Sequence, residues 1–335
     1  MTATTRTVGN VGGVPPGAAA VRFARRNAWV IGLLVLLGVM LLVTRWIEPS
    51  YGANGVQSLA VSALPIAFAA VAQAIIIIGG GIDLSIGSMM ALTNVTAAAL
   101  MKGNSDEFAI LVVIGIMLMG VVLGAINGGL VVLTRVPDIV VTLAMSFVWA
   151  GAALLVLGIP GGSAATWLKD LVVGSFGSEW LPKSLLILGI TVAIVWIPLK
   201  RSMLGLGIYA VGSDRQAAYR SGVPVRRTRV AAYTIGGFFA AMGGLALTAS
   251  TGIGTPIPGP YTLASVAAVV LGGVALTGGR GGVVGPIIAV LILSLVRTDL
   301  TLLRIDPNWA TVIEGAIMVA VVMFGALVLM RRSRS

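Results

Sequence analysis

The sequence predicts an all-α fold, a polytopic helical membrane protein with about ten transmembrane helices and broken helices near the centre. Two observations support this class. Of the 335 residues, 58% are apolar and only 10% are charged, whereas ordinary soluble domains carry about 25% charged residues. The mean hydropathy is +1.04, and the apolar residues fall into long runs. A soluble protein of this composition would lack a polar coat.

Each span is predicted from a run long enough for a bilayer, which a helix of about 20 apolar residues crosses. The runs cover residues 28–47, 56–78, 84–101, 108–133, 139–159, 184–199, 230–250, 261–277, 283–296 and 309–330. The runs that begin at 184, 261 and 283 are short, so each is a candidate for a re-entrant or broken helix.

Three regions follow from these runs. Residues 1–27 form a basic, disordered cytoplasmic tail, because they hold Gly, Pro and Arg and no apolar face. Residues 28–330 form the transmembrane domain, which begins with an uncleaved span that is too long for a signal peptide core. Residues 331–335 form a second basic cytoplasmic tail.

The placement of positive charge predicts the orientation. With ten spans and both termini cytoplasmic, sixteen Lys and Arg residues fall inside and six fall outside, as the positive-inside rule requires. Residues 160–183 then form an external segment with three aromatic anchors, and residues 200–229 form a cytoplasmic loop with seven basic residues. We expect a multi-pass protein of the cell membrane, inner or plasma.

Several kinds of chemistry find no support in the sequence. The chain has no Cys and no His, which removes disulfides, thiolates and the usual zinc sites. It has no Walker A motif for binding a nucleotide phosphate. The net charge of +11 is explained by orientation in the membrane rather than by nucleic acid. We predict no cofactor, no metal and no enzymatic activity of its own.

The stretch GGGIDLSIGS at residues 79–88 places Asp83 between two apolar runs. Ionisable residues at membrane depth are costly and tend to be functional. Two compatible interpretations stand. Asp83 is the N-cap of a helix that begins at Leu84, assisted by Ser85, or it belongs to the pathway or gate of a solute.

Gly120, Gly124 and Gly128 recur at every fourth position of one predicted span, beside Asn127. This spacing favours close packing against another helix. Asn127 then either bonds across helices or faces the solute. Asp138, at the predicted cytoplasmic edge, is expected to be hydrated and paired with Arg135.

Asp214 is predicted to cap a short helix over residues 215–220, which Gly222 and Pro224 terminate. A short capped helix on the cytoplasmic side is a candidate docking element. The alternative is a solvated basic linker beside the lipid headgroups.

Four segments resemble the sugar permeases of ABC importers of the ribose, xylose and arabinose type, which are related to branched-chain amino acid permeases. They are GGGIDLSIGS at 79–88, GAING at 124–128 with VPDIVVTL at 136–143, AVGSDRQAAYRSGVPV at 210–225, and AAVVLGG at 267–273 with GGRGGVVG at 278–285. The resemblance runs in order from about residue 55 to 330. Asp138 departs from the pattern, Ser213-Asp214 replaces Gly-Asn, and residues 261–264 lack two acidic positions.

This resemblance implies the membrane-spanning permease subunit of an importer for a monosaccharide or similar small polyol. It implies a separate cytoplasmic ABC ATPase of the double-domain type, an external or periplasmic sugar-binding protein, and a second permease copy (a homodimer) or a paralogue, all in membrane lipid and without nucleic acid. Asp83, Ser85 and Asn127 are the candidates for the substrate pathway or gate. The candidates for ATPase coupling are Asp214, Ala217, Ala218, Ser221 and Gly222.

The alternative function is a stand-alone secondary carrier or facilitator for a small polar solute. The scarcity of intramembrane carboxylates argues against a proton-driven carrier, because little is left to form a relay. A structural scaffold would have no need of glycine-broken helices around an aspartate.

Overall fold

The computed structural model describes residues 27–257, 259–306 and scattered positions between 308 and 323. The predictions for the tails at 1–26 and 331–335 lie outside the described residues, and the run at 309–330 lies largely outside them. The described helices are α2 (Ala28–Ile47), α3 (Ala53–Ile78), α4 (Ile86–Met101), α5 (Asp106–Thr134), α6 (Asp138–Val156), α7 (Thr166–Val172), α8 (Lys183–Arg201), α9 (Met203–Ser213), α10 (Arg215–Arg220), α11 (Val225–Thr251), α12 (Tyr261–Leu271) and α13 (Val284–Leu302).

Each predicted span up to residue 296 coincides with a helix. Seven helices in the described part of the chain are long and apolar enough to cross a membrane, namely α2, α3, α5, α6, α8, α11 and α13. The prediction of about ten is therefore too high by this measure. The reason is that α4 and α12 hold only 16 and 11 residues and the tenth run lies beyond the continuous description.

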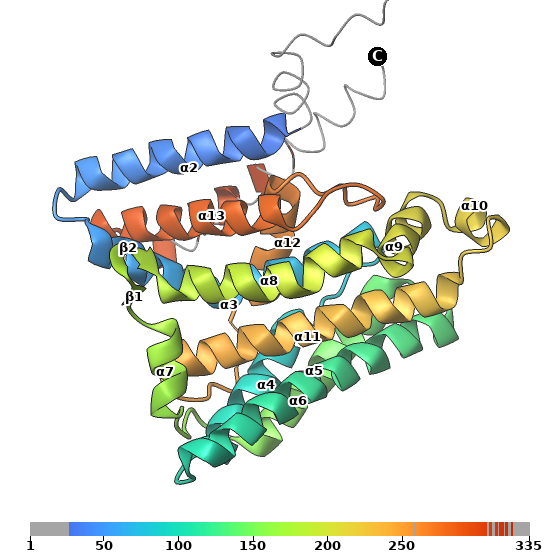
Figure 1. Cartoon of the computed structure of the whole chain (residues 1–335), viewed down its shortest axis with the longest axis horizontal. Coiled ribbons are helices and arrows are strands. Elements are labelled where there is room, and N and C mark those ends of the chain that lie inside the picture. Colours follow the sequence, from blue (N-terminus) through green and yellow to red (C-terminus); the bar gives the residue numbers. More distant parts are fainter. Residues whose placement is uncertain are drawn as a thin grey trace, which may run out of the picture.

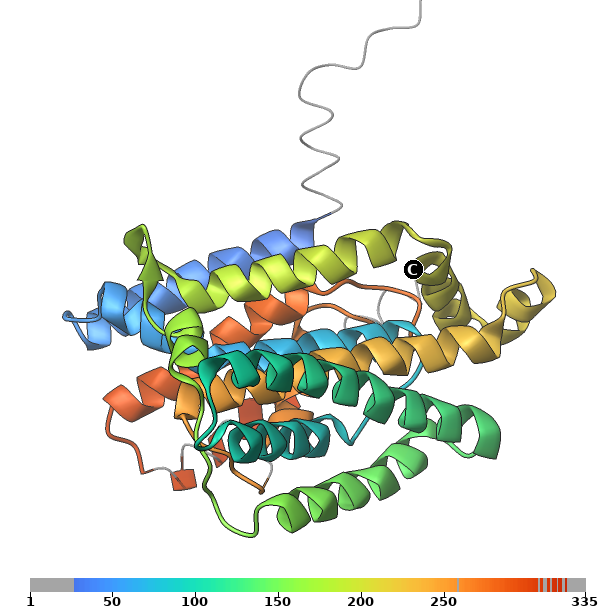
Figure 2. The same cartoon turned by 60° about the horizontal axis from the view of Figure 1, so that its bottom comes forward.

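The long helices run roughly along one direction, so the molecule has two distinct ends (Figure 1). At one end lie α9 and α10. At the other lie α7 and a small antiparallel hairpin of β1 (Ser175–Phe176) and β2 (Ser178–Pro182). Figure 2 shows the same separation from another side. The segments predicted to face the cytoplasm and the exterior thus lie at opposite ends of the bundle.

The stretch predicted as a cytoplasmic loop over 200–229 is mostly helical. It comprises the end of α8, all of α9 and α10, and the first turn of α11. The loop prediction missed α9 because its sequence is short and rich in glycine. That helix is held by tertiary packing, since Gly205, Gly207, Ile208, Val211 and Gly212 are buried.

The core is built around α3, which is buried along almost its whole length from Ala63 to Ile78. The helix α11 packs closely against α3 and also against α4 and α5. Where α5 meets α11, a Cβ atom on Gly128 would lie 2.9 Å from the Cβ of Tyr233, and one on Gly124 would lie 3.0 Å from the Cα of Gly237. The close-packing interpretation of these glycines is confirmed.

The outer helices expose large apolar side chains. Leu155 of α6 is 90% exposed, Trp46 of α2 is 85% exposed and Leu133 of α5 is 77% exposed. Water disfavours apolar surface of this extent, whereas lipid tails are as apolar as Leu. Together with the seven long helices, this supports a polytopic helical membrane protein.

Candidate functional site

The site begins where α3 ends. Gly80 has a φ of +77°, the N–H of Gly80 bonds to the carbonyl of Ile77, and the N–H of Gly81 bonds to the carbonyl of Ile76. This pair of bonds is a Schellman motif, which needs a left-handed residue and so favours glycine. The chain then runs without helix through Gly79–Ser85, here called the broken segment, before α4 begins at Ile86.

Asp83, Ser85, Asn127 and Trp149 form a buried polar cluster around the broken segment. The Asp83 carboxylate accepts the backbone N–H of Ser85 at 2.7 Å and its hydroxyl at 2.6 Å. The Asn127 amide donates to Ser85 Oγ at 2.6 Å and to Asp83 at 3.3 Å. Trp149 Nε1 donates to Asn127 Oδ1 at 3.2 Å. The three predicted pathway residues therefore meet, although they come from two distant parts of the sequence.

The prediction that Asp83 caps a helix starting at Leu84 is wrong in its geometry. The helix starts two residues later, its N-cap residue is Ser85, and neither the Asp83 nor the Ser85 side chain bonds to the first N–H groups of the helix. Asp83 instead closes a tight turn onto Ser85, as Asx residues often do before a helix. Of the two interpretations of Asn127, bonding across helices is confirmed by its contacts. All three predicted side chains are fully buried, so solvent does not reach them in this conformation.

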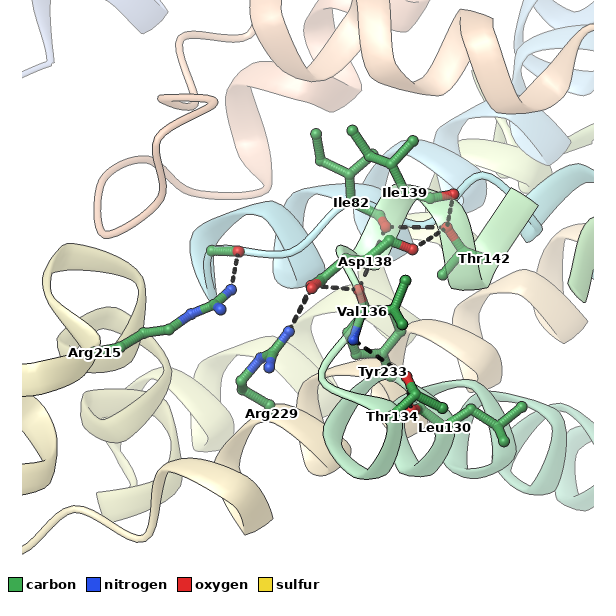
Figure 3. Close-up of polar contacts among 11 residues, drawn as sticks. Ile82, Leu130, Thr134, Val136, Asp138, Ile139, Thr142, Arg215, Arg229 and Tyr233 are labelled. Atoms are coloured by element: carbon green, nitrogen blue, oxygen red, sulfur yellow. Dashed lines mark hydrogen bonds and ion pairs between the residues drawn. The ribbon is translucent and has the colours of Figure 1, made fainter. Parts of the chain in front are cut away.

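A second cluster holds the other side of the broken segment (Figure 3). Arg229 Nη2 of α11 lies 2.6 and 2.7 Å from the two carboxylate oxygens of Asp138, at the start of α6. The Tyr233 hydroxyl donates to Asp138 at 2.9 Å and lies 3.3 Å from the carbonyl oxygen of Ile82. These residues, Asp138, Arg229 and Tyr233, are called the ion-pair cluster below.

The prediction for Asp138 is corrected on two points. Its partner is Arg229 rather than Arg135, and the side chains of the pair are only 12% and 13% exposed. Arg135 is exposed and ends α5 in the left-handed conformation, with a φ of 60°. A carboxylate this buried needs a cation with hydrogen bonds, and nearness in sequence did not identify that cation.

Two threonines complete the attachment of the broken segment. Thr142 Oγ1 of α6 accepts the N–H of Leu84 at 3.0 Å. Thr262 Oγ1 of α12 accepts the N–H of Gly87 at 2.9 Å, in the first turn of α4. Neither threonine was predicted from the sequence to contribute to the site, nor were Arg229, Tyr233 or Trp149. The lone carboxylate of Asp138 was the one signal that a buried cation and donors were needed.

At the end of the bundle, α10 forms as predicted. Asp214 accepts the N–H groups of Gln216 at 2.8 Å and Ala217 at 3.0 Å, and so caps the helix. Gly222 follows it with a φ of +81°. Ala217, Ser221 and Gly222 are exposed, whereas Ala218 is only 4% exposed. The predicted small-residue face is thus divided, because Ala218 points into the protein.

One open, mostly apolar groove of about 480 Å³ lies beside the start of α11. It is lined by Leu204, Arg226, Arg227, Val230, Ala231, Thr234 and Ile235. Within the described residues, no group of three or more His, Cys, Asp and Glu side chains is arranged to hold a metal ion.

Comparison with known proteins gives consistent matches. Residues 55–322 match the family described as "Branched-chain amino acid transport system / permease component". The chain is 30% identical to the ribose import permease protein of Escherichia coli, over 89% of this chain and 94% of that protein. It is also 30% identical to a "Probable ABC transporter permease protein" of Sinorhizobium fredii, over 95% of this chain and 96% of that protein.

A further relative is the autoinducer 2 import system permease protein of Escherichia coli, which is 27% identical over 89% of this chain and 92% of that protein. No solved structure matches the chain. The matched proteins are transport components rather than enzymes. The family match covers most of the chain, including the broken segment, both polar clusters and α10. The chain therefore belongs to the branched-chain amino acid transport system permease family, and it is the membrane-spanning permease subunit of an ABC transporter.

Proposed function

We propose that the chain is the permease subunit of an ATP-driven ABC importer that translocates a monosaccharide or a similar small polyol. The observation that carries this proposal is the family match over residues 55–322, together with relatives that import ribose and autoinducer 2. The solute is delivered by an external binding protein, and ATP is hydrolysed on a separate cytoplasmic ATPase chain. Both partners follow from the family.

In this proposal the broken segment and the buried polar cluster form the gate. Asp83, Ser85 and Asn127 join the start of α4 to α5. Because the cluster is sealed from solvent, solute passage requires the start of α4 to separate from α5. The polar groups then exposed are hydroxyl, amide and carboxylate groups, which are suitable hydrogen-bond partners for a polyol.

The proposed contact with the ATPase is α10. Ala217, Ser221 and Gly222 are exposed and small, so they suit a groove on the partner. Asp214 is the N-cap residue of the helix and accepts N–H groups of its first turn. The buried Ala218 anchors the helix to the rest of the permease. The exposed charge of Arg220 lies at the rim, where charge mainly sets registry and association rate.

We further propose ten spans with both termini cytoplasmic, in which α4, α12 and the run at 309–330 complete the seven long helices. The separation of α10 from the β1–β2 hairpin fits a topology in which these two segments lie on opposite sides of the membrane, and the excess of Lys and Arg on the α10 side favours this orientation. A second copy of the chain, or a paralogue, forms the other half of the pathway. The extensive apolar surface of the outer helices offers room for both this partner and lipid.

The test is reconstitution of the purified permease in vesicles with its ABC ATPase and binding protein. Labelled D-ribose is the first solute to try, followed by xylose and arabinose. We expect uptake that requires ATP and both partners, and we expect the ATPase to be retained in a pull-down with the permease. Solute movement by the permease alone in vesicles would replace this proposal with the stand-alone carrier or facilitator.

A further inference from the structure

Arg215 connects α10 directly to the broken segment. Its Nη2 donates to the carbonyl oxygen of Gly80 at 2.8 Å, across 135 residues of sequence (Figure 3). Arg215 is the first residue of α10, and Gly80 is the left-handed residue that ends α3. Carbonyls at a helix C-terminus are partly negative and lack helical partners, so a guanidinium is a favourable donor to them.

Around this bond the backbones of three segments, which contain Gly80, Gly212 and Gly278, lie in direct contact. A Cβ on Gly80 would lie 3.2 Å from the Cα of Gly212, at the end of α9. On the other side, the N–H of Gly279 bonds to the carbonyl of Ile78 at 2.9 Å. A Cβ on Gly278 would lie 2.9 Å from the Cα of Gly80. Close packing of this kind transmits displacement, because packed backbones cannot compress.

The far side of the same segment is held by different helices. Thr142 of α6 accepts from Leu84, and Tyr233 of α11 lies between Ile82 and the Asp138–Arg229 ion pair. Gly80 is thus tied to α10, while Ile82 and Leu84 are tied to α6 and α11. Movement of α10 relative to α6 and α11 would deform the segment between these two attachments.

We infer that Arg215 is a positioning residue that transmits movement of α10 to the broken segment, and so links the ATPase to the gate. This inference rests on the proposed function, in which the ATPase binds α10. It differs from a general role of α10 because it assigns the link to one side chain and one carbonyl. Removal of the donor then uncouples the two elements while leaving the ATPase contact in place.

The test compares Arg215→Met with Arg201→Met in the permease–ATPase complex. Both variants remove one positive charge from an exposed side chain, but Arg201, the last residue of α8, lies outside the proposed ATPase contact. Among the described residues it has no hydrogen bond or ion pair to the broken segment. The reporter is Ile82→Cys, which is the single thiol in this chain without cysteine. The rate at which a maleimide labels this cysteine is measured with and without ATP and vanadate. ATPase pull-down, basal ATP turnover and thermal stability are measured on the same variants.

We expect ATP with vanadate to change the labelling rate in the reporter chain and in its Arg201→Met variant. In the Arg215→Met variant we expect this change in labelling rate to be about tenfold smaller. Pull-down and basal turnover stay near those of the reporter chain in both variants. A merely structural role for Arg215 would lower stability without abolishing the response to ATP. An unaltered response in Arg215→Met, at intact pull-down, overturns the inference.

Two further results remain decisive. Should Arg215→Met fail to fold, Arg215→Ala, which also removes the donor to the Gly80 carbonyl, takes its place, and a full response in that variant overturns the inference. If the unmodified permease binds no ABC ATPase in the pull-down, the proposed function itself is contradicted. If the permease binds the ATPase but Arg215→Met responds to ATP fully, only the inference about Arg215 is contradicted.

Discussion

Arg229 and Asp138 lie 91 residues apart in the sequence and form an ion pair with a nitrogen–oxygen distance of 2.6 Å. The pair joins the first turns of α6 and α11 and lies against the broken segment through Tyr233. The chain therefore holds a largely buried charged pair beside the broken segment.

The first prediction concerns this pair. Removing one partner of a buried ion pair leaves an uncompensated charge and costs about 3–5 kcal/mol. We expect Asp138→Leu and Arg229→Met each to lower the free energy of unfolding in detergent by an amount of this order. The double variant should recover much of the loss, as a double-mutant cycle would measure. Single variants as stable as the unmodified chain would show that the pair is solvated.

The second prediction concerns Asp83. Asp83→Leu leaves the N–H and hydroxyl of Ser85 without their shared acceptor, and each buried orphan costs about 1–3 kcal/mol. Asp83→Asn keeps one acceptor oxygen for Ser85. We expect Leu to reduce thermal stability and uptake far more than Asn. Equal, unmodified transport by both variants would make Asp83 a bystander.

The third prediction concerns Gln73, whose amide oxygen and nitrogen are buried without a hydrogen-bond partner among the described residues. We expect Gln73→Leu to raise the free energy of unfolding by about 1–3 kcal/mol, because it removes a buried amide that lacks a hydrogen-bond partner. The matched control is Gln57 on the same helix, which already bonds to the carbonyl of Glu179 at 2.7 Å. Gln57→Leu should give no such gain, and a Gln73→Leu chain with lower stability would contradict the prediction.

The fourth prediction concerns Gly222. Its N–H bonds to the carbonyl of Tyr219 and the N–H of Val223 bonds to that of Ala218, which together form a Schellman motif. A residue with a Cβ in this left-handed conformation costs about 1–2 kcal/mol. We expect Gly222→Val to loosen the end of α10, to speed trypsin cleavage at Arg220 and to abolish stimulation of the ATPase. Gly129→Val, at a helical position with open space around it, is the control that should leave both readouts unchanged.

The fifth prediction concerns orientation. The chain has no native cysteine, so single cysteines report cleanly. Ser105, Ser178 and Ser213 are all exposed. We expect cysteines at Ser105 and Ser178 to react with an impermeant thiol reagent from outside intact cells, and one at Ser213 to react only after permeabilisation. The reversed pattern would invert the proposed topology.

Local features of the sequence predicted the secondary structure well. Hydropathy predicts the first span at 28–47, and α2 has those bounds. The helix predicted at 215–220, with Asp214 as its N-cap and Gly222 at its C-terminal end, also agrees with α10. Both depend on short-range physics, namely hydropathy over a helix length and hydrogen bonds between residues two or three positions apart. The same reasoning overestimated α4 and missed α9, because neighbouring helices decide where short, glycine-containing segments become helical.

The amino-acid sequence by itself determined the membrane class, the approximate positions of most long helices up to residue 296, the family and the residues of the broken segment. Each is encoded in composition, run length or motif, which need no knowledge of three-dimensional contacts. The tertiary structure alone decided that Asn127 bonds Ser85 and Asp83, that Asp138 pairs with Arg229 rather than Arg135, and that Arg215 reaches Gly80. These partners lie between 42 and 135 residues apart, and only the packing of α5, α6, α10 and α11 around one helix break brings them within hydrogen-bond distance.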